Sequence, residues 1–174
     1  MNYKDGIKRQ WHKNGKLMYE CNYKKGKNEG IARRWDENGQ LFLEENYKDG
    51  LQDGISKLWY ANGQLKVEKR YQCGKEEGLC RRWHENGQLA AESYSKDGKI
   101  VGLLRMWHKN GKLSSEGNFK DGKQEGSKSW YDNGQLEYEH DYKDGKLLTI
   151  KHFNYKDGKL LTTKRLEYGR QPKP

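Results

Sequence analysis

The sequence is short of the residues from which globular cores are built. Leucine, isoleucine, valine and phenylalanine together make up 27 of its 174 residues, whereas charged residues make up 34%. Such a composition is typical of disordered chains. Six tryptophans and twelve tyrosines argue against disorder, because they supply large apolar area at recurring positions. We therefore expect an ordered fold whose architecture needs little core.

Cysteine is scarce, and long apolar runs are absent. Cys21, Cys73 and Cys80 are an odd set without a Cys-x-x-Cys pair, so neither a disulfide framework nor a zinc site is indicated. Residues 1–10 are polar, and no apolar run approaches the roughly eighteen residues of a membrane span. These features predict a cytoplasmic protein without a cofactor.

Positive charge exceeds negative charge, with 35 lysines and arginines against 25 acidic residues. The electrostatic field of this net positive charge favours anionic partners. The excess is greatest from Lys143 onward, where nine residues are basic and three are acidic. The candidate contacts for an anionic lipid surface are Lys151, Lys156, Lys159, Lys164 and Arg165. The interpretation that we favour for this region is nevertheless a solvated basic end that serves solubility.

A repeat organises almost the whole chain. Tryptophan recurs at intervals of 24 residues from Trp11 to Trp107, and Trp130 follows after 23. Each tryptophan is followed three residues later by Asn-Gly, as at Asn38-Gly39, and a leucine follows that glycine by two residues. Asn-Gly is a strong hairpin signal, because both residues tolerate the positive φ of a type I′ turn. A second turn, such as Tyr47-Lys48-Asp49-Gly50, makes each unit read as strand, tight turn, strand, looser turn.

The two-residue turn sets a register. Around Asn38-Gly39 it places Arg33 opposite Glu44, and the same arithmetic places a base opposite an acid in all six hairpins. The pairs are Arg9 and Glu20, Arg33 and Glu44, Lys57 and Glu68, Arg81 and Glu92, Arg105 and Glu116, and Lys128 and Glu139. Each contributes only about 0.2 to 1 kcal/mol, so the row mainly fixes register. A three-residue loop with a glycine bulge is the competing register, and it would place tryptophan beside leucine instead of on the opposite face.

Consecutive hairpins without intervening helices predict the fold class. We expect an all-β protein with a single elongated antiparallel sheet built from β-hairpin repeats. Residues 1–145 are predicted to hold six repeats of about 24 residues, and residues 146–174 a divergent capping hairpin with a basic tail. The opening residues 2–6 resemble the end of a repeat, and we therefore expect a further segment upstream of this sequence. Open sheet edges predict self-association as a further contact.

The repeat motif resembles a known family. The pattern Gly-x-x-x-x-Trp-x-x-Asn-Gly-x-Leu-x-x-Glu, followed by Tyr-Lys-Asp-Gly-Lys-x-x-Gly, resembles the MORN-repeat variant of bacterial YwqK-family antitoxin proteins. The resemblance covers residues 2–165, although the opening unit lacks the Lys-x-x-Gly spacer and the final units lack tryptophan. It implies a β-hairpin solenoid used for protein contacts, in some members as the presumed antidote to a toxin. MORN repeats are also associated with membranes and phosphoinositides.

No catalytic set accompanies the repeats. Similar bacterial chains sometimes carry a kinase label, but this chain has neither a glycine-rich phosphate loop nor a separate catalytic domain. His12, His84 and His108 share the position after tryptophan, and a metal site is one hypothesis for them. Neighbouring units should place them about 9.6 Å apart, whereas zinc ligands lie within about 2.1 Å of the ion. We predict a non-enzymatic protein without a metal site.

The tryptophan and basic rows are the candidate partner-binding residues, because tryptophan, tyrosine and arginine most often anchor interfaces. They are Trp11, Trp35, Trp59, Trp83, Trp107, Trp130, Arg9, Arg33, Lys57, Arg81 and Arg105. In the alternative reading, the tryptophan rings are the core of a thin sheet. Nucleic acid is not expected, because the acidic partners would cancel much of the attraction to phosphate. The leading hypothesis is an antitoxin-like or immunity-like module that binds a protein partner, and the alternative is binding of anionic membranes or phosphoinositides.

Overall fold

A computed structural model describes residues 5–168, and every element in this range is a β-strand. All sixteen strands belong to one antiparallel sheet, so the predicted fold class of consecutive hairpins is confirmed. The chain divides into two compact parts, which are described separately. The first takes the chain up to Gln88 together with Ser95–Gly98, and the second takes Leu89–Tyr94 together with the chain from Lys99 onward. The start expected at residues 2–6 and the tail expected at the C-terminus lie largely outside the described residues.

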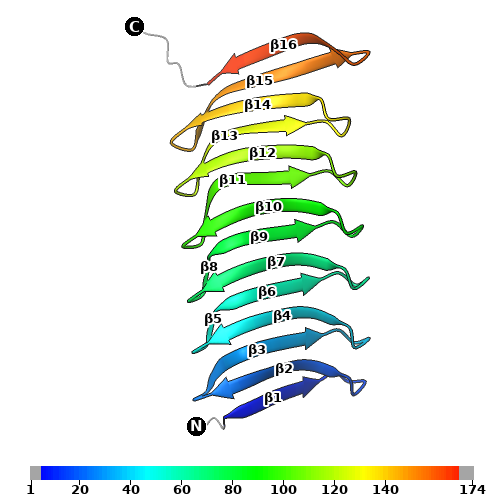
Figure 1. Cartoon of the computed structure of the whole chain (residues 1–174), viewed down its shortest axis with the longest axis vertical. Coiled ribbons are helices and arrows are strands. Elements are labelled where there is room, and N and C mark those ends of the chain that lie inside the picture. Colours follow the sequence, from blue (N-terminus) through cyan, green and yellow to red (C-terminus); the bar gives the residue numbers. More distant parts are fainter. Residues whose placement is uncertain (1–4, 169–174) are drawn as a thin grey trace. The chain divides into compact units, whose positions relative to one another are not determined.

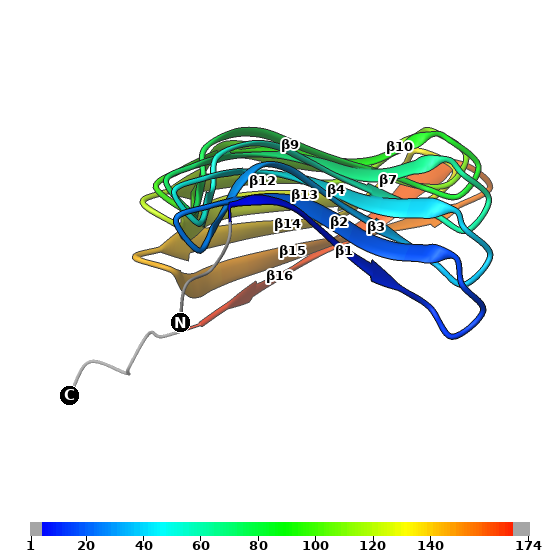
Figure 2. The ribbon, with the colours of Figure 1, turned by 90° about the horizontal axis from the view of Figure 1, so that it is seen from below.

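The strands of each part follow the order of the chain (Figure 1). The first part contains β1 (Gly6–Trp11), β2 (Leu17–Lys24), β3 (Lys27–Trp35), β4 (Leu41–Lys48), β6 (Gly54–Trp59), β7 (Leu65–Gln72) and β9 (Gly78–Trp83), with the short β5 (Leu51–Gln52) paired to β4 and β8 (Lys75–Glu76) to β7. The second part contains β11 (Lys99–Trp107), β12 (Leu113–Lys120), β13 (Lys123–Trp130), β14 (Leu136–Lys143), β15 (Lys146–Lys156) and β16 (Lys159–Glu167). Strand β10 (Leu89–Lys96) has residues in both parts. Figure 2 shows that the strands of the first part bend along their length.

The two-residue turn was expected at Asn-Gly, but the structure has it in the segment that joins one hairpin to the next, as at Asp49-Gly50. Asp49 and Gly50 both have positive φ, 51° and 85°. Lys48 and Leu51 face each other directly across them. Positive φ at both central residues defines the type I′ hairpin turn, which an aspartate followed by glycine adopts readily. The prediction of a looser turn at this position is therefore wrong.

The Asn-Gly segment instead forms a three-residue loop. Gly39 has a φ of 87°, whereas Asn38 is not among the residues with positive φ. The amide of Gly39 donates to the carbonyl of Asp36 at 2.9 Å, and the amide of Asp36 donates to the carbonyl of Gln40 at 2.9 Å. A type I turn followed by a left-handed glycine gives this pattern. The predicted type I′ turn at Asn-Gly is wrong, because asparagine here keeps an ordinary φ.

The register nevertheless agrees with the predicted pairs, because a bulge compensates for the longer loop. Trp35 faces Leu41, as the competing register requires, and Phe42 is the extra residue of the bulge. Beyond it, Arg33 faces Glu44 as predicted. The expectation that tryptophan and leucine lie on opposite faces is wrong, since they are cross-strand partners.

Five of the six predicted base–acid pairs are confirmed. Their shortest N–O distances lie between 2.6 Å and 3.6 Å. They are Arg9 with Glu20, Arg33 with Glu44, Lys57 with Glu68, Arg105 with Glu116 and Lys128 with Glu139. Arg81 and Glu92 belong to different parts of the chain, so their pairing stays a prediction.

The core of the first part is thin and lies on one side of the sheet. Cys21 and Ala32 face each other across β2 and β3 and are 0% and 3% exposed. Because side chains alternate along a strand, the pair formed by Glu20 and Arg33 lies on the opposite side. Ile31, two residues from Arg33, is 42% exposed there. We call the two sides the tyrosine face, which carries Tyr19, Cys21 and Tyr23, and the ion-pair face, which carries Glu20 and Arg33.

Candidate functional site

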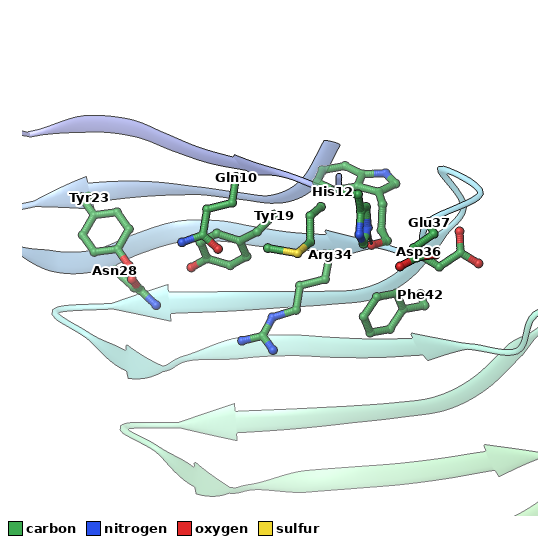
Figure 3. A pocket seen from close by; sticks show the side chains of 11 residues that line it. Gln10, His12, Tyr19, Tyr23, Asn28, Arg34, Asp36, Glu37 and Phe42 are labelled. Atoms are coloured by element: carbon green, nitrogen blue, oxygen red, sulfur yellow. Dashed lines mark hydrogen bonds between the residues drawn. The ribbon is translucent and has the colours of Figure 1, made fainter. Parts of the chain in front are cut away.

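A groove of about 710 Å³ lies on the tyrosine face of the first part. Its lining residues come from β1 to β4 and the loops that follow β1 and β3: Gln10, His12, Met18, Tyr19, Tyr23, Asn28, Arg34, Trp35, Asp36, Glu37 and Phe42. Figure 3 shows the labelled side chains gathered on one side of the strands. The volume falls in the range of about 300 to 1,000 Å³ that is usual for ligand sites.

The bulges supply two of the apolar walls. Met18 is skipped in the pairing of Gln10 with Tyr19 and of Trp11 with Leu17, and Phe42 is skipped in the same way one unit later. Both line the groove and are half-buried. In both units, the bulge in the strand that follows the Asn-Gly loop therefore brings an extra side chain to the groove.

Two adjacent arginines differ in what they contact. The Arg33 guanidinium lies 2.8 Å from a carboxylate oxygen of Glu44 on the ion-pair face. Arg34 lines the groove, and its guanidinium lies over the ring of Tyr19, 5.6 Å from the centroid. Within residues 5–168, no hydrogen bond or ion pair is formed by the Arg34 side chain. Arg34 is exposed, so its guanidinium donors face solvent and are open to a ligand in the groove.

A polar cluster borders Arg34 on the tyrosine face. The Tyr47 hydroxyl donates to one oxygen of Glu45 at 3.0 Å, and the Gln52 amide donates to the other at 2.5 Å. Burial and the Glu45 carboxylate raise the pKa of Tyr47 to about 12, and Arg34 opposes this rise. Burial also raises the pKa of Tyr19 well above its ordinary value, with hydrogen bonding to Cys21 adding to the rise. Both phenols therefore stay protonated at neutral pH, and the Tyr47 hydroxyl donates its proton in the hydrogen bond to Glu45.

The residue after tryptophan joins successive units. His12 Nε2 donates to the carbonyl of Trp35 at 2.8 Å, and His108 Nε2 donates to that of Trp130 at 2.9 Å. The Tyr60 hydroxyl makes the equivalent bond to the carbonyl of Trp83 at 2.8 Å. A histidine at this position therefore serves the contact between hairpins. Within the described range, no group of three or more histidine, cysteine, aspartate or glutamate residues is arranged to hold a metal ion.

The predicted partner-binding rows lie in different surroundings. Trp11 is 58% exposed, whereas the other five tryptophans are half-buried. Trp35 contributes to the groove. On the ion-pair face of the first part, glutamates engage Arg9, Arg33 and Lys57, and in the second part Glu116 engages Arg105.

The predicted lipid contacts of the second part also differ from one another. Lys151 pairs with Glu139 at 3.0 Å, and Arg165 lies 3.6 Å from Glu167. Lys156 and Lys159 face each other across a two-residue turn. Lys164 lies opposite His152. The described residues include no helix with the length and apolar character needed to cross a bilayer.

A smaller hollow of about 250 Å³ lies in the second part and is lined by Ser115, Ser127, Ser129 and His140 among others. Ser127 Oγ lies 3.3 Å from His140 Nδ1, the approach that a nucleophile and its base would use. The described contacts of His140 are otherwise aromatic, with the Tyr138 ring stacked 5.7 Å away. No carboxylate among the described residues bonds the imidazole, so the pair lacks the orienting group of a catalytic triad.

The sequence prediction missed the groove and Arg34. Arg34 directly follows Arg33 of the basic row, and the sequence pattern alone does not distinguish the roles of two adjacent arginines. The available signal is that this position varies from unit to unit, with Gln10 and Leu58 in the neighbouring units.

The fold defines an all-β protein of consecutive hairpin repeats, and the groove lies on one face of its first part. A family model described as the MORN repeat variant matches residues 4–25, 28–49, 52–72, 76–97, 100–121 and 127–144, together more than half of the chain. The chain belongs to the MORN-repeat variant family. MORN repeats are modules that bind proteins or membranes and do not catalyse reactions. No curated protein matches the sequence.

Proposed function

We propose that this protein is a cytoplasmic, antitoxin-like or immunity-like module that binds a protein partner through the groove of the tyrosine face. The observation that carries the proposal is the combination of aromatic rings from Tyr19, Trp35 and Phe42 with the unused guanidinium of Arg34. Such residues supply most of the binding energy in protein interfaces. Three free cysteines suit a reducing compartment.

Affinity capture from native extract tests the proposal. The bait is the whole chain, and the groove variant combines Tyr19→Ala with Phe42→Ala. A matched control combines Ile31→Ala with Ile55→Ala, which are 42% and 43% exposed on the ion-pair face. We expect a stoichiometric protein partner with the wild type and the control but not with the groove variant. Absence of any stoichiometric partner would count against the proposal.

The predicted tryptophan row is tested in the same assay. Trp11 is the most exposed tryptophan, and Trp11→Ala removes it without touching the groove lining. If the row contributes to binding, this variant retains less partner. The antitoxin role needs a separate test: expression of the neighbouring reading frame should arrest growth, and co-expression of this chain should restore it. A harmless neighbour would remove the reason for the antitoxin reading.

A second candidate function is binding of anionic membranes by the second part. Lysines face each other across its two-residue turns, in the pairs Lys120 with Lys123, Lys143 with Lys146, and Lys156 with Lys159. Facing like charges are destabilising, and an anionic surface would relieve the repulsion. Flotation with phosphatidylserine vesicles should recover the wild type and lose the variant Lys143→Gln/Lys146→Gln. The control Lys8→Gln/Lys66→Gln removes the same charge from the first part, and equal loss there would indicate a non-specific charge effect.

A further inference from the structure

We propose that the groove recognises a carboxylate of the partner protein, with Arg34 as the residue that binds it. The occupant is an extended protein segment in which an aspartate, a glutamate or the C-terminal carboxylate adjoins an aromatic or aliphatic side chain. The rings of Tyr19, Trp35 and Phe42 hold that side chain. The inference rests on the proposed function, because it names the chemistry of the partner at the same site.

The geometry of Arg34 leaves it ready for a carboxylate. Its guanidinium lies 5.6 Å from the centroid of the Tyr19 ring, and an aromatic face occupies none of the five N–H donors. Those donors match a carboxylate in a bidentate arrangement. Contact with the half-buried ring also limits the side chain's freedom, so less entropy is lost when a ligand binds.

The carboxylates near Arg34 are already engaged. Glu44 pairs with Arg33 on the other face of the sheet, and both oxygens of Glu45 accept hydrogen bonds from Tyr47 and Gln52. Lys69, another basic residue of the tyrosine face, forms an ion pair with Glu76. Lys8 and Lys66 of the first part also lie over aromatic rings, 5.0 Å from the centroid of Tyr23 and 5.1 Å from that of Tyr60, but neither lysine lines the groove, whereas Arg34 does.

The charges of the groove also give the ligand a direction. Oδ1 of Asp36 accepts the amides of Asn38 and Gln40, both at 2.9 Å, so this oxygen serves the loop. Glu37 is exposed at the loop end of the groove, as Figure 3 shows, and leaves a negative charge there. A segment that places its acid at Arg34 and a basic or neutral group near Glu37 fits both charges.

The test is selection of a phage-displayed random dodecapeptide library on the immobilised whole chain at physiological salt. The variants are Arg34→Ala, Arg34→Lys and the control Arg33→Ala, which removes the same charge from the ion-pair face. Circular dichroism checks that all three keep the strand signal. Selected peptides are then resynthesised, with asparagine or glutamine replacing the acid, and their affinities are measured by calorimetry.

We expect the enriched peptides to carry an acidic residue beside an apolar one. Arg34→Ala should weaken them about thirtyfold or more, as loss of an interface anchor does. Arg34→Lys should recover only part of the affinity, and Arg33→Ala should leave it within about threefold, because Arg33 does not line the groove. Enriched peptides without an acid, or acidic peptides equally sensitive to both arginines, would overturn the carboxylate assignment and leave protein binding intact. Failure to enrich any peptide would overturn the assignment too, and affinity capture would then decide the proposed function alone.

Discussion

The alternating charges of the ion-pair face should make a simple charge swap destabilising. Arg33 faces Glu44 on one side and Glu20 on the other, and Glu44 also faces Lys57. Exchanging Arg33 and Glu44 by Arg33→Glu with Glu44→Arg keeps their mutual attraction. It also places a glutamate opposite Glu20 and an arginine opposite Lys57. An isolated pair would tolerate the exchange, whereas a continuous row would not.

The magnitude follows from the number of contacts that change sign. Two facing pairs worth about 0.2 to 1 kcal/mol each become repulsive, which gives a loss of roughly 1 to 4 kcal/mol before screening. The side chains of Arg33 and Glu44 are 38% and 23% exposed, so solvent reduces the loss to about 1 to 2 kcal/mol. Neutralising both residues with glutamine should cost less, because it creates no repulsion.

Urea unfolding followed by circular dichroism measures the difference through the midpoint of the transition. The swap variant should unfold at lower urea than either the wild type or the double glutamine variant. In 1 M NaCl the gap should narrow, because the screening length falls to about 3 Å. A swap variant as stable as the wild type at low salt would refute the view that the row acts as a unit.

Three further predictions concern single side chains. Hydrogen bonds from Lys151 and Lys128 lower the pKa of Glu139. The contribution of this carboxylate to folding stability is therefore complete above the ordinary pKa of 4.5 and is lost as the pH falls towards the lowered pKa. Glu139→Gln should flatten the acid limb of a curve of folding stability against pH. Tyr47→Phe should remove a phenol that ionises near pH 12 from the ultraviolet titration, because burial and Glu45 hold the Tyr47 pKa at that level. Cys73 is exposed and should react with a thiol reagent in the native protein, whereas the buried Cys21 and Cys80 should react only after urea is added.

The base–acid pairs could be predicted even though the turn was assigned wrongly. The actual loop has one residue more than expected, but Phe42 adds one residue to the facing strand, so Arg33 and Glu44 still meet. The turn types themselves were harder to predict, because Asn38 and Asp49 both precede a glycine and both suit either loop.

The groove could not be derived from spacing alone. Its key contact joins Arg34 to Tyr19, which are partners across β2 and β3, so it depends on the register of the turn between hairpins. The sequence pattern predicts a looser turn there. Lys25 and Gly26 form a two-residue turn, and a bulge follows where the pairing shifts between Asn22 and Cys21. Together the turn and the bulge place Tyr19 opposite Arg34.

The repeat separates residues that maintain the sheet from residues free to specify a partner. The position two before each tryptophan is basic in every unit, and in five of the six units this base pairs with a facing glutamate. The next position carries no such constraint, and it holds Gln10, Arg34, Leu58, Arg82, Met106 and Ser129 in successive units. In the first unit this position faces Tyr19 across the tyrosine face, as Arg34 does one unit later. Variation on the groove side is therefore compatible with an unchanged register, and chemistry specific to a partner can accumulate there without weakening the fold.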